Sequence, residues 1–394
     1  MERIGIYGGS FNPPHPGHLR LAQYALKTLE LDRVLMIPTR IAPHKAMPPD
    51  TPSPEQRLEM LRLMLQEEEG IEASDLELKR EGLSYTYETV DELRAMYPQA
   101  ELFLLLGSDM LESFHKWKES ARILKQVMLA AFSRGGKGEK QILSEAKDRL
   151  MAQGARVTVL DNPVTELSST DVRRMLIFQC AKPLLTPAVH DYILKCGLYG
   201  TARDYRKLPT QELERVVVSL LKESRVKHVL GCAQTCAELA ALYGADETDA
   251  LRAGLLHDIT KALDGDLQLT LCREYGMILD TFSRQNPKTL HALTGSLVAQ
   301  RIFWEKREVV DAICSHTTGK ADMNLLEKIL YVADYMEPNR DFPGVEALRY
   351  LAYTDITKAL KLGLTMTLEM LHRQQREVSP ESADALAYLE NAGV

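Results

Sequence analysis

The sequence has no long hydrophobic run, and none of its apolar stretches approaches the roughly 18 residues that a membrane span requires. Its first residues, MERIGIYGG, contain no apolar signal-peptide core followed by a cleavage site. The six cysteines are scattered along the chain and include no C-x-x-C pair. We therefore expect a protein of the reducing cytoplasm with no membrane partner.

Basic residues are fewer than acidic residues. Lysine and arginine number 48 against 55 aspartates and glutamates, which gives a formal net charge of -7. This balance argues against a general DNA- or RNA-binding protein, although a single basic phosphate pocket remains compatible with it. The length of 394 residues, with 45% hydrophobic and 26% charged residues, predicts a globular protein of more than one domain.

The hydrophobic pattern changes near residue 200. Before it, short apolar stretches alternate with segments of helical periodicity, as in an α/β domain whose parallel sheet carries helices on both faces. Strands are predicted at 3–9, 33–39, 71–79, 101–109, 127–133 and 156–161, and helices at 19–31, 53–69, 85–97 and 139–153. After the polar stretch TARDYRKLPT, every periodic segment is helical. We predict an α/β domain at 1–200, a linker at 201–210 and an all-α domain at 211–394.

The first predicted strand runs into GGSFNPPHPGHL, which begins at Gly8. The glycine pair lets the backbone approach a ligand, and the helix that starts near His18 offers free amide groups to an anion. In an open parallel sheet this loop lies at the carboxyl ends of the strands, where ligands bind. His15 and His18 could donate hydrogen bonds to phosphoryl oxygens. A metal site and a plain proline-rich turn are the alternatives.

A second phosphate-binding pattern, LSSTDVRRML, starts at Leu167. Ser168, Ser169 and Thr170 provide hydroxyl groups and an N-cap, and Arg173 lies one turn into the predicted helix. Alone, such residues usually just cap a helix. Together with the first motif they indicate a site for phosphate groups.

With these two motifs, residues 1–200 resemble the HxGH and SSTxxR nucleotidyltransferases, and specifically the bacterial nicotinate-nucleotide adenylyltransferases. The segments PTRIAPHK, SYTYETVDEL, LLLGSDMLESFHKW and PAVHDYILKCGLY extend the resemblance. It implies that His15, His18 and Arg173 act in catalysis on ATP and that Mg²⁺ assists. The 5′-phosphate of nicotinate mononucleotide would attack the α-phosphorus. The residues that it assigns to ATP or substrate binding are Gly8, Gly9, Ser10, Phe11, Lys45, Tyr85, Thr86, Gly107, Asp109, Trp117, Ser168, Ser169 and Thr170.

The departures from this family are mild. It usually has threonine where this chain has Ser108, and isoleucine where it has Leu167 and Val172. Pantetheine-phosphate adenylyltransferases and cytidylyltransferases share the phosphate motifs, so another acceptor such as phosphopantetheine is the alternative. Trp117 could stack on the pyridine ring or simply pack.

The helical half contains an ordered series of imidazole and carboxylate ligands. Such ligands suit iron, manganese or zinc, and six of them can hold two metals. A single histidine such as His228 is more often a packed residue than a ligand, but a His–Asp pair directly after a leucine run is hard to explain by packing. The series is His228, His257, Asp258, His291, His316 and Asp334.

This half resembles the HD-domain phosphohydrolases, and in particular their YqeK-type group, through HVLGCAQTCAELA, AGLLHDITK, HALTGSLVA and SHTTGKADMNLLEKILYVADYMEPNRD. That group resembles symmetrical diadenosine tetraphosphate hydrolases, which release two ADP. The resemblance implies two metals, with iron the expected ion. The first would be held by His228, His257, Asp258 and Asp334, and the second by Asp258, His291 and His316. Asp258 and Lys261 would act in catalysis, and Lys261 and Arg340 would contact substrate phosphates.

Two other interpretations of the helical half stay open. It could be a nucleotidase or phosphodiesterase acting on a mononucleotide or guanosine tetraphosphate, or a regulatory metal-binding module without catalysis. Lys261 could equally be a solvated surface lysine. The sequence also leaves open whether the chain forms a homo-oligomer.

Overall fold

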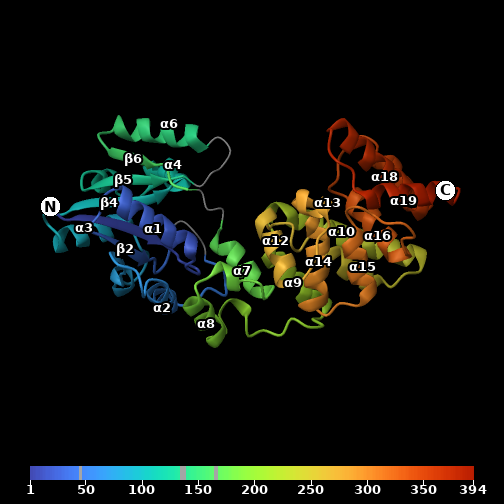
Figure 1. Cartoon of the computed structure of the whole chain (residues 1–394), viewed down its shortest axis with the longest axis horizontal. Helices are drawn as coiled ribbons and strands as arrows, with labels where there is room; N and C mark the ends of the chain where they lie inside the picture. Colours follow the sequence, from blue (N-terminus) through green and yellow to red (C-terminus); the bar gives the residue numbers. More distant parts are fainter. Residues whose placement is uncertain (44–46, 134–138, 164–166) are drawn as a thin grey trace. The chain divides into compact units, whose positions relative to one another are not determined.

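The computed structural model describes residues 1–43, 47–133, 139–163 and 167–394. The chain divides into two compact units, Met1–Arg203 and Asp204–Val394 (Figure 1). Among the helices in these ranges, none combines the length and the apolar character that a membrane crossing needs.

The first unit is built on a six-stranded parallel sheet with the order β3-β2-β1-β4-β5-β6. Its strands are β1 (Arg3–Gly9), β2 (Arg33–Pro38), β3 (Ile71–Ala73), β4 (Glu101–Gly107), β5 (Val127–Phe132) and β6 (Arg156–Leu160). The chain adds β2 and β3 on one side of β1 and then returns to add β4 on its other side. The crevice beyond the carboxyl ends of β1 and β4 is therefore the place where such sheets bind ligands.

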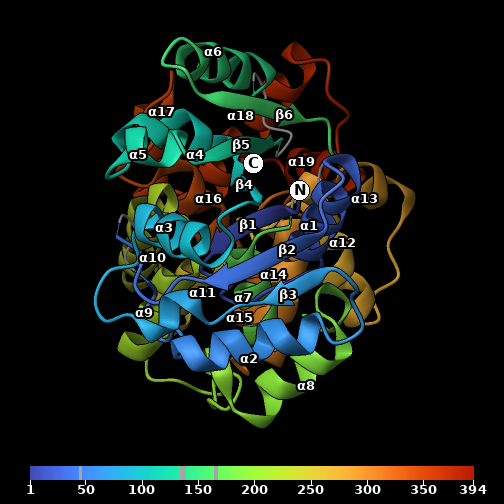
Figure 2. The same cartoon turned by 90° about the vertical axis from the view of Figure 1, so that its left-hand side faces the viewer.

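Both faces of this sheet are buried. On one face Ile4, Leu104 and Leu129 join a core with side chains of the helices α3, α4, α5 and α6. The alternate residues, such as Met36 and Phe103, are buried as well, which explains why the strands read as nearly continuous apolar runs. The helices are α1 (Pro16–Thr28), α2 (Pro54–Met64), α3 (Thr86–Met96), α4 (Ser108–Ser113), α5 (Ser120–Leu124), α6 (Glu139–Met151), α7 (Ser169–Ile177) and α8 (Pro187–Lys195). Figure 2 shows α8 beside α2 and α6 beside β6.

The predicted strand at 71–79 is too long. β3 ends at Ala73, and Leu76–Lys79 form a 3₁₀ turn. In this turn Glu77 is buried and accepts a hydrogen bond from the Thr89 hydroxyl at 2.8 Å. The alternation of apolar and polar residues in LELK fits both structures, because a single turn is too short to reveal a helical period.

Every regular element in the described part of the second unit is helical (Figure 1). The helices are α9 (Thr210–Leu220), α10 (Glu223–Tyr243), α11 (Glu247–Leu256), α12 (Gly265–Glu274), α13 (Thr281–Gln285), α14 (Leu290–Arg301), α15 (Arg307–Ser315), α16 (Leu325–Met336), α17 (Val345–Ala352), α18 (Ile356–Arg373) and α19 (Pro380–Asn391). The predicted order of an α/β domain followed by an all-α domain is confirmed.

The later part of the predicted linker packs on the second unit. The Lys207 amide donates to the Phe303 carbonyl at 2.9 Å, and Arg252 donates to the Leu208 carbonyl at 2.8 Å. Arg252 is held in turn by Glu305, at 2.8 Å from its Nε. The compact second unit consequently begins at Asp204, six residues before α9.

Candidate functional site

The two phosphate motifs of the first unit meet at the loop between β1 and α1. The Ser169 hydroxyl donates to the Pro13 carbonyl at 2.9 Å, and Arg173 Nη1 donates to the Asn12 carbonyl at 2.7 Å. Arg173 Nη2 also donates to Thr170 Oγ1 at 3.1 Å. The N-terminal turn of α7, capped by the Ser168 side chain, is thereby fixed against the loop that leads into α1.

The two histidines of this loop lie against each other, with ring centroids 3.8 Å apart. The His15 amide donates to His18 Nδ1 at 3.2 Å, so in the neutral ring the His18 hydrogen is at Nε2. Burial, assisted by the charge of Arg20, lowers the pKa of His15 to about 3. Its Nδ1 is buried without a hydrogen-bond partner in the part of the chain that the structure describes. Neutral imidazoles of this kind can donate hydrogen bonds to phosphoryl oxygens.

Other predicted binding residues of this unit lie at or just beyond strand and helix ends. Gly8 and Gly9 end β1, and Ser10 follows them. The Phe11 ring is 1% exposed and packs on Tyr7 and His18, so only the Phe11 backbone can face a ligand.

A second group of predicted binding residues lies near the neighbouring strand β4. Gly107 ends that strand and the exposed Asp109 follows in α4, while Tyr85 and Thr86 begin α3. The half-buried Trp117 ring lies 5.0 Å from the Phe114 ring. Lys45 falls outside the described residues.

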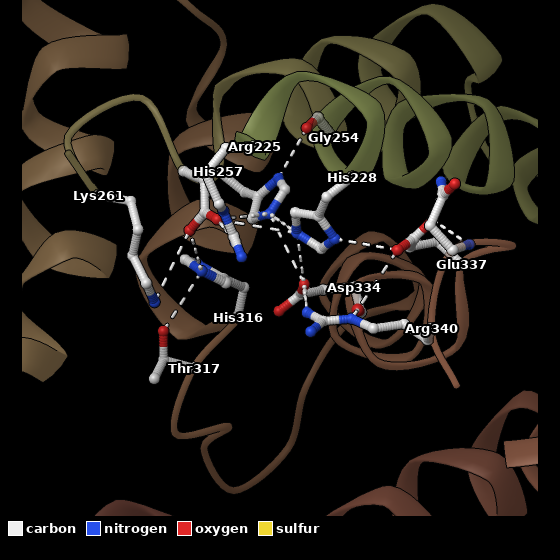
Figure 3. A network of polar contacts seen from close by, with 12 residues as sticks. Arg225, His228, Gly254, His257, Lys261, His316, Thr317, Asp334, Glu337 and Arg340 are labelled. Carbon is white, nitrogen blue, oxygen red and sulfur yellow. Dashed lines mark hydrogen bonds and ion pairs between the residues drawn. The ribbon is translucent and has the colours of Figure 1, made fainter. Parts of the chain in front are cut away.

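The second unit brings all six predicted metal ligands together. Figure 3 labels His228, His257, His316 and Asp334 among them. His228 lies on α10, His291 on α14 and Asp334 on α16. The helix α11 ends at Leu256, and His257 and Asp258 occupy the turn that follows. His316 similarly follows the end of α15.

Close helix packing positions the first two histidines. A Cβ at Gly254 on α11 would lie 2.5 Å from the Cα of Ala233 on α10, so only glycine permits this approach. His228 Nε2 then lies 3.2 Å from His257 Nε2 and 3.1 Å from Asp334 Oδ1.

The Asp258 carboxylate lies between two groups of ligands. Its Oδ2 is 3.7 Å from His228 Nε2 and 3.6 Å from His257 Nε2. Its Oδ1 is 3.4 Å from His291 Nε2 and 3.9 Å from His316 Nε2. The geometry therefore supplies one ligand group on each side of this carboxylate.

In three of the histidines, the ring nitrogen Nδ1 already lies within hydrogen-bond distance of an oxygen atom. Nδ1 lies 2.7 Å from the Gly254 carbonyl in His257, 2.6 Å from the Ile313 carbonyl in His316, and 3.1 Å from Glu337 Oε1 in His228. Such partners orient metal-binding imidazoles and direct the Nε2 lone pair toward a cation. Burial also lowers the pKa of His316 to about 3, which keeps it neutral. These residues fit a centre for one or two divalent cations.

Three basic residues border the carboxylates. Arg225 pairs with Asp258, and Arg340 Nη2 donates to Asp334 Oδ1 at 2.7 Å. Lys261 Nζ lies 2.8 Å from His291 Nε2, and burial lowers the pKa of this lysine to about 8. Phosphate groups at the centre would meet positive charge from all three.

Sequence reasoning missed Arg225 and Glu337. Arg225 precedes His228 by three positions on α10, and Glu337 follows Asp334 by three positions at the end of α16. Residues at this spacing lie on the same face of a helix, so the periodicity around the two ligands was an available signal.

Comparisons with known proteins match the two halves of the chain to two different families. The Cytidylyltransferase-like family matches residues 6–175, and the HD domain family matches residues 225–339. A protein of Exiguobacterium sibiricum is 36% identical over 200 residues, which are 50% of this chain and 100% of the relative. One of Rhodopirellula baltica is 38% identical over 191 residues, 46% of this chain and 89% of the relative. Both carry the name "Probable nicotinate-nucleotide adenylyltransferase".

Through its first half, the chain belongs to the nicotinate-nucleotide adenylyltransferase family. Among solved structures, a "predicted HD superfamily hydrolase involved in NAD metabolism" from Clostridium acetobutylicum is 35% identical, covering 47% of this chain and 98% of its own, with a TM-score of 0.46. The Plasmodium falciparum nicotinic acid mononucleotide adenylyltransferase complexed with NaAD is 20% identical, covering 51% and 98%, with a TM-score of 0.43. The E. sibiricum adenylyltransferase matches along its whole length, although it spans only half of this chain.

Proposed function

We propose that the first unit transfers the adenylyl group of ATP to nicotinate mononucleotide. An oxygen of the 5′-phosphate attacks the α-phosphorus, the bond to the β-phosphate bridging oxygen breaks, and pyrophosphate leaves as deamido-NAD forms. The observation that carries this proposal is the meeting of the two phosphate motifs in a chain of this family.

The residues of the loop can bind and orient the triphosphate without any protein nucleophile. The His18 ring, whose Nδ1 accepts from the His15 amide, can donate its Nε2 hydrogen to a phosphoryl oxygen. Arg173 uses some of its five N–H groups on Asn12 and Thr170 and keeps others for phosphate. Mg²⁺, bound with ATP, would neutralise part of the charge on the phosphates.

The acceptor is tested directly with the full chain, ATP and Mg²⁺. We expect deamido-NAD and pyrophosphate in equal amounts from nicotinate mononucleotide. Phosphopantetheine and nicotinamide mononucleotide serve as competing acceptors. Faster adenylylation of phosphopantetheine would replace the proposed acceptor, and no transfer to any of them would contradict the activity.

We further propose that the second unit holds two divalent cations, iron in the first instance, and cleaves diadenosine tetraphosphate into two ADP. The shared position of Asp258 between two ligand groups supports two cations. The charges of Asp258, Asp334 and Glu337 are balanced by those of Arg225, Lys261 and Arg340. Two cations would therefore add excess positive charge, which favours an oligophosphate over a neutral substrate.

Bound metals would supply a hydroxide at neutral pH. Hydrolysis would join an oxygen of water to one of the two central phosphorus atoms, and the bridging oxygen between them would leave with the second ADP. Lys261 and Arg340, which lie beside His291 and Asp334, would neutralise the charge that the leaving phosphate gains.

The hydrolase is tested on the full chain, purified without oxygen and supplied with iron. Diadenosine tetraphosphate is added, and the products are separated by ion exchange. ADP as the sole product supports the proposal. Two bound metals without cleavage would favour a nucleotidase acting on another nucleotide, and His257→Ala against the exposed His372→Ala assigns any activity to this centre.

A further inference from the structure

Arg57 is a charged residue that neither motif contains and that lies almost entirely inside the first unit. It stands on α2, and 1% of it is exposed. All its hydrogen bonds go to main-chain carbonyls. They join Nη1 to Ser10 at 2.7 Å, Nη2 to Thr39 at 2.7 Å and Arg40 at 3.2 Å, and Nε to Pro52 at 3.4 Å.

These carbonyls belong to three separate chain segments. Ser10 begins the loop after β1, Thr39 and Arg40 follow β2, and Pro52 precedes α2. One guanidinium therefore ties the carboxyl ends of two adjacent strands together, at the edge of the sheet where the phosphate motifs meet.

No carboxylate of the described residues forms an ion pair with Arg57. Among carboxylates, the one whose charge acts on Arg57 is Glu55, two positions earlier in the first turn of α2. A buried charge without a partner destabilises a fold relative to a well-packed apolar side chain. Stability alone thus gives little reason for an arginine here, whereas a negatively charged ligand beside the loop would compensate the charge.

The hydrogen bonds also set the direction of the loop's peptide groups. Ser10, Asn12 and Pro13 all have their carbonyls bound by side chains, from Arg57, Arg173 and Ser169 respectively. In a trans peptide the carbonyl and the following N–H point in opposite directions. Binding of the Ser10 carbonyl by Arg57 therefore turns the Phe11 N–H away from Arg57.

We propose that Arg57 is a positioning residue for adenylyl transfer, fixing the Ser10–His15 loop in its phosphate-binding conformation and placing a buried positive charge behind it. This inference rests on the proposed adenylyltransferase function. It assigns no contact between Arg57 and substrate, since the side chain acts through the carbonyls that it holds.

Arg57→Gln and Arg57→Lys test the proposal in the full chain, with Arg62→Gln as the matched control. Arg57→Gln removes the charge, and Arg57→Lys keeps the charge but loses the planar fork. Arg62 lies on the same helix, is exposed and only approaches Glu59 at 3.8 Å. A misplaced loop is expected to lower kcat by about 100-fold in Arg57→Gln. Arg57→Lys should recover part of this loss, and Arg62→Gln should match the wild type.

The values of kcat and KM are measured separately for each variant. Thermal melts monitored by circular dichroism show how much of each variant is folded, so that kcat refers to folded molecules. We expect kcat to fall and KM for ATP to rise, with KM for nicotinate mononucleotide unchanged. A folded Arg57→Gln with wild-type kcat and KM would overturn the proposal. So would the loss of folding in both variants, because Arg57 would then have a structural role.

Failure of the proposed function is recognised separately. If the wild type makes no deamido-NAD, calorimetric titration with ATP and Mg²⁺ still compares the variants. Weaker ATP binding in Arg57→Gln than in Arg62→Gln would uphold the role of Arg57 in the loop, and equal binding would overturn it.

Discussion

At the scale of single residues, the loop after β1 depends on protonation as well as on position. His18 Nδ1 accepts a hydrogen bond from the His15 amide, and this contact fixes which ring nitrogen carries the hydrogen. His15 itself is buried and neutral. His15 can consequently donate a hydrogen bond to phosphate without adding a full charge.

Replacement of His18 by alanine should remove adenylyl transfer. The variant loses one donor to the phosphates and also the partner of the His15 amide, so we expect a fall of at least about 100-fold in kcat. His115→Ala, an exposed position in the same unit, is the control. Because no residue of the second unit changes, its hydrolase activity should persist. Deamido-NAD synthesis at the wild-type rate would show that the assignment of His18 is wrong.

Burial of His15 makes the first unit less stable in acid. The folded protein binds this proton only near pH 3, whereas the unfolded chain binds it near pH 6.5. The free energy of unfolding is thus highest above pH 6.5 and falls toward pH 3, by up to about 1.4 kcal/mol per pH unit from this group.

Urea unfolding at several pH values measures this slope. A Trp304→Phe background leaves Trp117, in the first unit, as the only tryptophan of the chain. Adding His15→Gln should flatten the dependence between pH 6.5 and 4. Parallel pH profiles with and without His15 would contradict the neutral, buried state.

At the scale of elements, the two glycines at the end of β1 have different roles. A Cβ at Gly9 would lie 3.2 Å from the Phe11 ring, while a Cβ at Gly8 would have no atom of the described residues within 4 Å beyond its chain neighbours. Gly9 thus serves the packing of the loop, and Gly8 leaves space beside it.

Alanine at the two positions should separate stability from binding. Gly9→Ala is expected to lower the melting temperature, since Phe11 must shift. Gly8→Ala should melt like the wild type but bind ATP more weakly, because its methyl group enters the space beside the loop. Thermal melts and KM for ATP measure both effects, and an unchanged KM in Gly8→Ala would place the nucleotide elsewhere.

The strongly periodic elements were predictable from the sequence, and the short ones were not. The strands around 33–39 and 101–109 were recognised because they form nearly continuous apolar runs, and the helix at 139–153 because its apolar residues recur with a helical period. The helices α4 and α5, with six and five residues, are too short to show one.

Site residues followed the same rule. Ligands in dense motifs were found, and the structure brings them together. Arg57 was missed because nothing in its neighbourhood of α2 distinguishes a buried arginine from an exposed one. Its partners lie up to 47 positions away, and only the folded sheet brings them to it.

At the scale of the whole molecule, the chain consists of two units with separate candidate sites. The ligands of the metal centre all come from helices or turns of the second unit, and the phosphate motifs all come from the first. Binding that stabilises one unit should therefore leave the intrinsic site of the other intact.

Metal removal provides the corresponding prediction. A cation that binds only the folded second unit stabilises it in proportion to RT ln(1 + [M]/Kd). Chelation should lower the melting temperature of one unfolding transition, and His257→Ala should lower the melting temperature of the same transition. Adenylyl transfer, assayed with Mg²⁺ restored, should stay unchanged. Calorimetry with and without iron measures the shift. A metal-independent melting profile would argue against the centre, and the exposed His372→Ala is the control.

The position of Asp258 predicts that the candidate metal centre does not tolerate even an isosteric exchange at this residue. Its two oxygens are equivalent, and each faces a different pair of histidines. An asparagine would keep the shape but lose that symmetry, since one end of an amide accepts while the other carries two hydrogens. Whichever way it turned, one pair of imidazoles would face an oxygen and the other pair would face hydrogens, so the two halves of the centre could no longer be alike.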